Sequence, residues 1–154
     1  MCIRERYSQS VVNLAPRVDS MVFDTVGRGA KVVTGGKTRQ DEKFAHGYFY
    51  SPTLLVDVDP ASRAVKEECF GPALSIVRVK DLDDAIQQAN SSVYGLASLI
   101  RTKHLAVAEK AAERREAVRV WIIKAAHIDY DELPFGGVKQ SGLSREHGYE
   151  APEY

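Results

Sequence analysis

The residues with the clearest capacity for chemistry are consecutive: Glu67, Glu68, Cys69 and Phe70, followed by the turn pair Gly71-Pro72. Two carboxylates, a thiol and an aromatic ring thus stand just ahead of an apolar run that is typical of a buried strand. Polar groups at the mouth of a sheet strand are a common place for a ligand site. A carboxylate there can accept hydrogen bonds from a pair of sugar hydroxyls, and Glu68 is our candidate. The alternative is that both glutamates are solvated loop charges, because most glutamates in proteins are exposed.

Neither cysteine is predicted to be a catalytic nucleophile. Cys69 has no histidine base at a recognisable spacing, and two adjacent carboxylates oppose the low pKa that a reactive thiol needs. We therefore interpret Cys69 as a structural thiol, whereas Cys2 lies at the start of the chain without a readable environment. The two cysteines and four histidines also lack the spacing of metal ligands, so the sequence predicts no metal site.

A second loop of interest surrounds Phe135, which is followed by Gly136 and Gly137. Glycine has no Cβ, so the backbone here can approach another group closely. That group is either a ligand or another strand, and the sequence leaves both open. The glycine-rich segments 27–29 and 35–37 do not predict a nucleotide site, because the first closes a helix and the second lacks the spacing of a phosphate loop.

The totals exclude several classes of function. The chain has 154 residues, enough for one domain with a core, and its 21 basic residues equal its 21 acidic residues. A chain without a basic excess is not expected to bind nucleic acid or an anionic membrane surface. No apolar run approaches the roughly 20 residues of a membrane span, and the first residues lack the apolar core of a signal peptide. We therefore expect a cytoplasmic protein.

Hydrophobic periodicity predicts an α/β fold. Helices are expected at 17–26, 82–89 and 103–116, and strands at 31–34, 53–58, 73–79, 96–101 and 118–123. From residue 73 onward strands and helices alternate, which implies a parallel sheet with helices on its faces. Asp81 and Thr102 are candidate N-caps, since each directly precedes a predicted helix.

The segment from Glu67 to Pro72 resembles the Glu-Glu-x-Phe-Gly-Pro motif of the aldehyde dehydrogenase superfamily. Other matches stand in the family's order: Gly29-Ala30-Lys31-Val32, Gly35-Gly36, Gly47-Tyr48-Phe49, Pro52-Thr53, Ala89-Asn90, Tyr94-Gly95-Leu96 and the run from Pro134 to Gly142. The resemblance covers residues 16–154 as a partial catalytic domain, and residues 1–15 are a segment of unclear match. Many matches in order identify a family more specifically than any single motif does.

The resemblance implies NAD(P)-dependent oxidation of a small-molecule aldehyde to a carboxylic acid. In that family a catalytic cysteine attacks the aldehyde, hydride passes to the nicotinamide of NAD or NADP, and a glutamate-activated water hydrolyses the thioester. By resemblance, Glu68 binds the hydroxyls of the nicotinamide ribose and Phe70 contacts the nicotinamide side. Phe135 lines the aldehyde channel on the same basis.

The matched residues correspond to only the later part of the family's catalytic domain. They do not include the segments that carry the family's dinucleotide-binding domain, catalytic cysteine and general-base glutamate, and Cys2 stands closer to Gly35-Gly36 than that cysteine does. We therefore expect the chain by itself to be a truncated, inactive fragment. The alternatives are a truncated gene product and a non-catalytic binding or oligomerisation module, which pairs with itself or with a full-length relative. Ile123 also departs from the family, which usually has asparagine after the Val-Trp-Ile strand.

The resemblance also bears on the substrate. The loop from Trp121 to Pro134 has the length found in aromatic-aldehyde members, such as vanillin and salicylaldehyde dehydrogenases, and Asp129 falls where those have an acidic residue. The Phe-Gly-Gly-Val-Lys-Gln-Ser-Gly run is also similar to that of semialdehyde members. Both branches stay open at this point.

Overall fold

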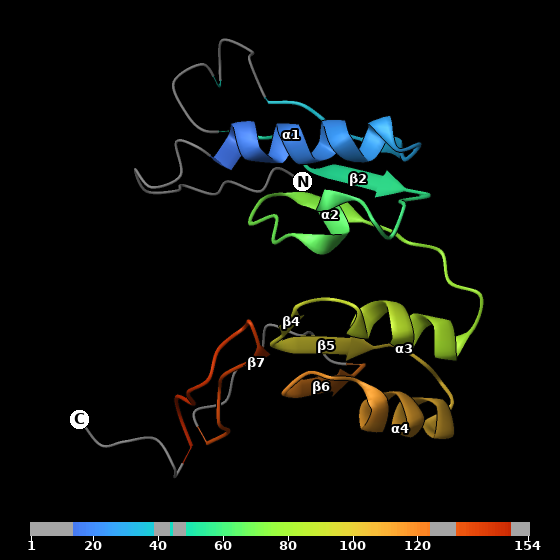
Figure 1. Ribbon diagram of the computed structural model, residues 1–154, viewed down its shortest axis with the longest axis vertical. Helices are drawn as coiled ribbons and strands as arrows, with labels where there is room; N and C mark the ends of the chain where they lie inside the picture. Colours follow the sequence, from blue (N-terminus) through green and yellow to red (C-terminus); the bar gives the residue numbers. More distant parts are fainter. Residues whose placement is uncertain (1–13, 39–43, 45–48, 124–131, 149–154) are drawn as a thin grey trace. The chain divides into compact units, whose positions relative to one another are not determined.

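The computed structural model describes residues 14–38, 44, 49–123 and 132–148. They belong to two compact units, residues 1–78 and 79–154, and each unit combines helices with strands (Figure 1). The predicted α/β class is therefore confirmed. Among the helices of the described residues, none is long and apolar enough to cross a membrane.

The first unit is a three-stranded sheet with two helices. Its elements are α1 (Leu14–Gly27), β1 (Lys31–Thr34), β2 (Thr53–Val56), α2 (Arg63–Lys66) and β3 (Ala73–Ser75). The sheet order is β1-β2-β3; β1 runs antiparallel to β2, and β2 runs parallel to β3. Pairing continues just beyond β3, because the Ile76 amide donates to the Leu55 carbonyl at 2.9 Å. The hydrophobic pattern does not predict α2, which has four residues.

Helix α1 supplies much of the core of this unit. Its apolar residues recur at three- and four-residue steps, and Val18, Met21 and Val22 on that stripe are buried, as the period predicts, whereas Val26 is 40% exposed. The buried cluster consists of Val18, Val22, Ala30, Leu55 and Val58. The core therefore joins α1 to the strand that runs down the middle of the sheet.

The beginning of α1 corrects the prediction. The helix starts at Leu14, three residues before the predicted start at Arg17, and Pro16 lies inside its first turn. Proline is tolerated there because the first N–H groups of a helix have no partner within the helix.

The second unit contains two small sheets and two longer helices. Its elements are α3 (Leu82–Asn90), β4 (Tyr94–Gly95), β5 (Ala97–Ile100), α4 (Leu105–Arg114), β6 (Arg119–Ile122) and β7 (Val138–Lys139). β5 pairs in parallel with β6 over its whole length, and β4 pairs antiparallel with β7. The predicted strand–helix–strand arrangement of residues 96–123 is confirmed.

The two predicted helix caps have different outcomes. The Asp81 carboxylate accepts a hydrogen bond from the Asp84 amide at 2.9 Å, so Asp81 caps α3 as predicted. Thr102 does not cap α4, because that helix begins two residues later than expected and His104 is its N-cap residue. The Thr102 hydroxyl instead accepts from the His104 amide at 3.1 Å, which makes a turn ahead of the helix.

The strand pairing also differs from the prediction in one respect. Alternation along the chain implies that residues 73–79 share a sheet with the two later strands. The observed hydrogen bonds pair β3 with β2, and they pair β5 with β6 in a separate sheet. β2 and β3 are consecutive strands, but the helix between them, α2, has four residues and is not predicted. The strand–helix–strand unit that they form is therefore not visible in the hydrophobic pattern.

One carboxylate links all three strands of the first sheet. The Asp57 side chain accepts hydrogen bonds from Arg78 Nε at 2.6 Å and from Lys31 Nζ at 3.0 Å. Lys31 begins β1, Asp57 follows β2, and Arg78 lies beyond β3. The hydrogen bond from Arg78, followed by that from Lys31, holds the pKa of the Asp57 carboxyl below its usual value. Asp57 has a φ of 55°, a left-handed conformation that asparagine also adopts readily.

We predict that Asp57→Asn lowers the free energy of unfolding near neutral pH. The difference in that free energy between the variant and the wild type should become smaller as the pH is lowered. Because the pKa is lowered in the folded chain, the contribution of Asp57 is present above the pKa of an unfolded aspartate, about 3.9, and is lost as the pH falls through the folded-state value. Urea unfolding from about pH 6 to about pH 3 measures the difference. Glu109→Gln, which removes an exposed carboxylate elsewhere, controls for the loss of charge. A difference that stays constant across this pH range would contradict the prediction.

Ile123 has an unfavourable backbone conformation. Its amide donates to the Ile100 carbonyl at 2.9 Å and so closes the β5–β6 ladder, but its φ is 67°. A β-branched side chain is strained at positive φ, and this side chain is 60% exposed, so no burial offsets the strain. Asparagine, the usual family residue here, accepts the left-handed conformation readily.

Ile123→Asn is therefore expected to raise the free energy of unfolding by about 1 kcal/mol, measured by urea unfolding. The control is Ile122→Asn, one residue earlier within β6. Asparagine disfavours extended strand backbone, so this control should lower the stability. Equal effects of the two substitutions would show that backbone strain at Ile123 is not the cause.

Candidate functional site

The candidate segment leaves α2 at Glu67 and enters β3 through Gly71-Pro72. The Pro72 carbonyl accepts from the Thr53 amide at 2.8 Å, which fixes the segment's end against β2. Gly71 is required where it stands, because a Cβ on it would lie 2.4 Å from Val18 Cγ2 of α1. The glycine of the motif therefore lets the loop approach the core helix closely.

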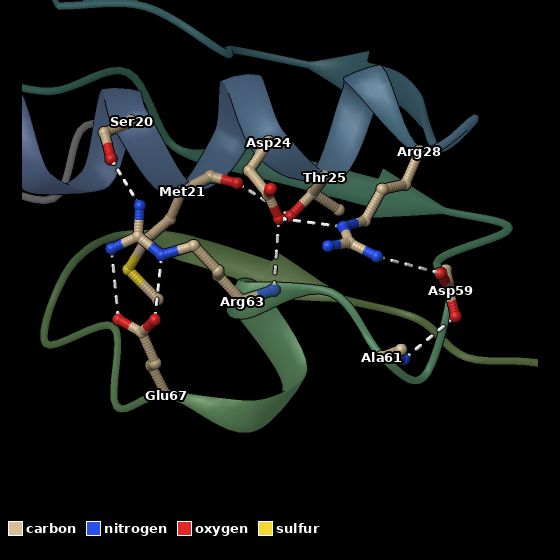
Figure 2. A network of polar contacts seen from close by, with 9 residues as sticks. All are labelled: Ser20, Met21, Asp24, Thr25, Arg28, Asp59, Ala61, Arg63 and Glu67. Carbon is tan, nitrogen blue, oxygen red and sulfur yellow. Dashed lines mark hydrogen bonds and ion pairs between the residues drawn. The ribbon is translucent and has the colours of Figure 1, made fainter.

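The structure shows that the two glutamates have different environments, a difference that the sequence does not reveal. Arg63 donates to both carboxylate oxygens of Glu67, from Nε at 2.8 Å and from Nη2 at 3.1 Å (Figure 2). This hydrogen bonding lowers the pKa of Glu67. Glu68 is exposed, and its carboxylate makes no hydrogen bond or ion pair with any other described residue. Its backbone carbonyl is held instead, by Arg17 Nη2 at 2.7 Å. Glu68 is thus the carboxylate that is available to a ligand.

Phe70 is presented in an unusual way. Its side chain is 65% exposed, and its φ of 47° lies in the left-handed region. Non-glycine residues in that region are uncommon, and strained backbone of this kind tends to cluster at functional sites. The ring is therefore open to a planar ligand two residues away from the available Glu68 carboxylate.

Cys69 lies between these two exposed residues but packs inward. Its half-buried side chain contacts the buried cluster of the first unit. Burial raises the pKa of its thiol, which disfavours the thiolate that a nucleophile requires. These observations agree with the interpretation of Cys69 as structural. Cys2 lies outside the described residues.

A shallow hollow adjoins the Gly71-Pro72 turn. Its volume is about 490 Å³. It is lined by Thr34, Pro52, Thr53, Leu54, Gly71, Pro72, Ala73 and Leu74. Apolar side chains and backbone thus continue from the motif along β2 and β3, as is common for small-molecule sites.

Phe135 is held by contacts within the second unit. It exchanges two backbone hydrogen bonds with Glu146, at 2.6 and 2.7 Å. The Arg119 guanidinium lies 4.8 Å from the centre of its ring. Beside it, a groove of about 370 Å³ is lined by Val118, Arg119, Val120, Trp121, Leu133 and Pro134. Phe135 is therefore half-buried at the rim of an apolar groove.

The two glycines after Phe135 allow the loop to pack closely against other residues of the same chain. A Cβ on Gly136 would lie 2.3 Å from the Ser144 carbonyl oxygen, and one on Gly137 would lie 2.3 Å from Ser141 Cβ. The sequence left open whether these glycines allow approach to a ligand or to another strand. The distances show that the loop packs against another segment of its own chain.

Lys139 fixes the end of that loop. Its ammonium donates to the carbonyls of Asn90 and Ser92, at 2.8 and 3.1 Å, and pairs with Glu116 at 2.5 Å. Lys139 itself has a φ of 56°, so three side-chain contacts hold a residue in a strained conformation. Its partners are far from it in sequence, and no local pattern could have identified them.

The structure therefore brings Glu68 and Phe70 together in the first unit and places Phe135 in the second. It adds two residues that the sequence reasoning missed, Arg17 and Arg63. The spacing of Arg63 and Glu67, four residues apart, is a helical ion-pair signal that could have indicated their contact. The described residues contain no group of three or more histidine, cysteine, aspartate or glutamate side chains that could hold a metal ion.

This fold and this pair of loops define an α/β segment built around the Glu-Glu-Cys-Phe-Gly-Pro motif. Residues 12–154 match the sequence profile of the aldehyde dehydrogenase family, and the chain belongs to that family. It is 42% identical over 129 residues to a succinate-semialdehyde dehydrogenase [NADP(+)] of Deinococcus radiodurans, covering 84% of this chain and 26% of the relative. It is 43% identical over 121 residues to an aldehyde dehydrogenase of Enchytraeus buchholzi, covering 79% and 23%.

Solved structures agree with this assignment. A betaine aldehyde dehydrogenase of Staphylococcus aureus in complex with NAD+ superposes with a TM-score of 0.84 at 33% identity, covering 90% of this chain and 27% of that one. A lactaldehyde dehydrogenase of Escherichia coli gives 0.83 at 35% identity, covering 90% and 28%. The chain spans about a quarter of the length of the curated relatives that it matches.

We predict that Lys139→Met destabilises the second unit by about 1 kcal/mol, because the substitution keeps the length of the side chain but removes its charge-assisted hydrogen bonds. Urea unfolding measures the loss. Lys110→Met is the matched control, since Lys110 pairs at 2.9 Å with the exposed Asp83, to which Arg114 also donates. This control should have the smaller effect, because exposed pairs contribute little. An equal or larger effect of Lys110→Met would contradict the role given to Lys139.

Proposed function

We propose that this chain supplies the nicotinamide-ribose contacts and part of the aldehyde channel of an NAD(P)-dependent aldehyde dehydrogenase, which oxidises an aldehyde to a carboxylic acid. The observation that carries the proposal is the pairing of an available carboxylate, Glu68, with the exposed ring of Phe70. Family membership gives this pairing its meaning, because the two residues occupy the motif positions expected to contact the cofactor.

The residues present fit such a cofactor. An ionised carboxylate has two acceptor oxygens, so Glu68 can accept a hydrogen bond from each of two neighbouring ribose hydroxyls. The Phe70 ring is flat and exposed, and it can pack against a planar ring. When bound, the nicotinamide accepts a hydride from the substrate. The contribution of this chain is to bind the ribose and to limit the positions available to the ring.

The 154 residues by themselves are proposed not to turn over aldehyde. The described residues contain one cysteine, Cys69, and its half-buried thiol has a raised pKa and no activating base among them. An activated thiolate is required for attack on the aldehyde. Phe135, beside the groove of the second unit, is proposed to line the channel of the whole enzyme.

The substrate is proposed to be a semialdehyde or an aromatic aldehyde. The first class is supported by the similarity to the succinate-semialdehyde dehydrogenase. The second rests on the length of the loop that leads to Phe135; Asp129 of that loop lies outside the described residues. A cytoplasmic location and association with itself or with a full-length relative stay predictions.

The cofactor-side proposal predicts that nicotinamide mononucleotide, the ribose-bearing half of the cofactor, shifts the amide resonances of residues 67–70 in NMR titrations. Glu68→Gln should weaken this binding about tenfold, the effect expected for losing charge-assisted hydrogen bonds. Glu109→Gln, an exposed substitution on α4, should leave it unchanged. Shifts that ignore Glu68→Gln, or that lie elsewhere in the chain, would refute the assignment.

Turnover is tested by following NAD(P)H formation by the purified, folded chain with succinic semialdehyde, betaine aldehyde and vanillin. We expect no signal with either NAD+ or NADP+. Formation of NAD(P)H that is abolished by Cys2→Ala, and not by Cys69→Ala, would show that the chain holds a nucleophile of its own and would overturn the proposed inactivity.

A further inference from the structure

A network of polar contacts joins α1 to α2 through Arg63 (Figure 2). The Asp24 carboxylate accepts from the Arg63 backbone amide at 3.2 Å and from Arg28 Nε at 3.3 Å. The Arg63 guanidinium donates from Nη1 to the Ser20 hydroxyl at 2.7 Å. Both the backbone and the side chain of Arg63 are therefore anchored on α1.

The same guanidinium reaches the other end of α2. Its remaining donors form the two hydrogen bonds to Glu67, which is the C-cap residue of this helix. Planar, bidentate arginine–carboxylate pairs fix orientation as well as distance. Because Glu67 precedes Glu68 directly, the contact fixes one side of the Glu68 backbone.

Arg17 of α1 fixes the other side. Its Nη2 donates to the Glu68 carbonyl at 2.7 Å and lies 3.9 Å from a carboxylate oxygen of Glu67. Two arginines thus hold the backbone on both sides of a residue whose own carboxylate has no partner among the described residues. That arrangement leaves Glu68 fixed at its backbone and open at its carboxylate.

We propose that Arg63 and Arg17 are positioning residues for Glu68, which present its carboxylate to the ribose hydroxyls. The inference rests on the proposed function for the identity of the ligand but not for the ordering of the loop. Holding the loop in its binding conformation removes an entropic cost that would otherwise be met on binding. Neither arginine is placed in contact with the ligand, so their effect passes through Glu68.

A purely structural role predicts a different result. The side chains of Arg63 and Glu67 are 39% and 41% exposed, and exposed ion pairs contribute little to global stability. A positioning role therefore predicts a small change in melting temperature together with a large change in the order of the loop. A structural role predicts that both change together.

The test compares Arg63→Gln with Arg28→Gln. Both remove a guanidinium near Asp24, but only Arg63 bonds to Glu67 (Figure 2). The ¹⁵N heteronuclear NOE of the Glu68 and Phe70 amides reports the order of the loop, and titration with nicotinamide mononucleotide reports binding. We expect Arg63→Gln to lower the NOE at both amides and to weaken binding about tenfold at nearly unchanged melting temperature. Arg28→Gln should change neither readout.

Three outcomes would overturn the positioning role: a loop that stays ordered in Arg63→Gln, a loop that loses order equally in Arg28→Gln, or a large fall in melting temperature that accompanies the loss of order. If Arg63→Gln fails to fold, Arg63→Lys and Arg17→Gln take its place, since lysine keeps the charge but cannot form the bidentate pair. Failure of the wild-type chain to bind the mononucleotide, with loop order still dependent on Arg63, would reject the cofactor assignment and leave the positioning of Glu68 supported.

Discussion

Helix α2 has too few residues to be stable in water by itself, because the first helical turn fixes several residues for a single hydrogen bond. Its existence depends on α1, which holds Arg63 by the backbone through Asp24 and by the side chain through Ser20. The direction in which the chain leaves α2 then determines where Glu67 and Glu68 lie. The candidate site is therefore built on a helix–helix contact, although the motif itself is a loop.

The second unit holds its loop in a similar way. Lys139 fixes the strand after Phe135 by donating to the carbonyls of Asn90, the last residue of α3, and Ser92, two residues further on. The Asn90 side chain in turn donates to the carbonyl of Arg114, the last residue of α4, and accepts from the Glu116 amide just beyond it. In both units, a long cationic side chain joins a motif loop to the ends of helices. Each loop thereby gains order without a large apolar contact of its own.

The sequence could predict what local patterns encode. The apolar stripe of α1, the cap at Asp81 and the parallel pair β5–β6 follow from period, capping chemistry and alternation. The parallel pairing of β2 with β3 could not be predicted, because the helix that joins them, α2, is too short to show a hydrophobic period. For the site, resemblance singled out Glu68 and Phe70, but it gave no reason for their availability. That reason lies in long-range contacts of Arg17 and in the left-handed backbone of Phe70.

Three neighbouring residues of the motif meet three different environments. Glu67 is paired with Arg63, Cys69 packs on the core with a raised pKa, and the Glu68 carboxylate has no partner among the residues that the structure describes. The backbone is left-handed at Phe70, and Gly71 admits the chain beside Val18. A carboxylate and an aromatic ring thus become accessible on either side of a half-buried thiol.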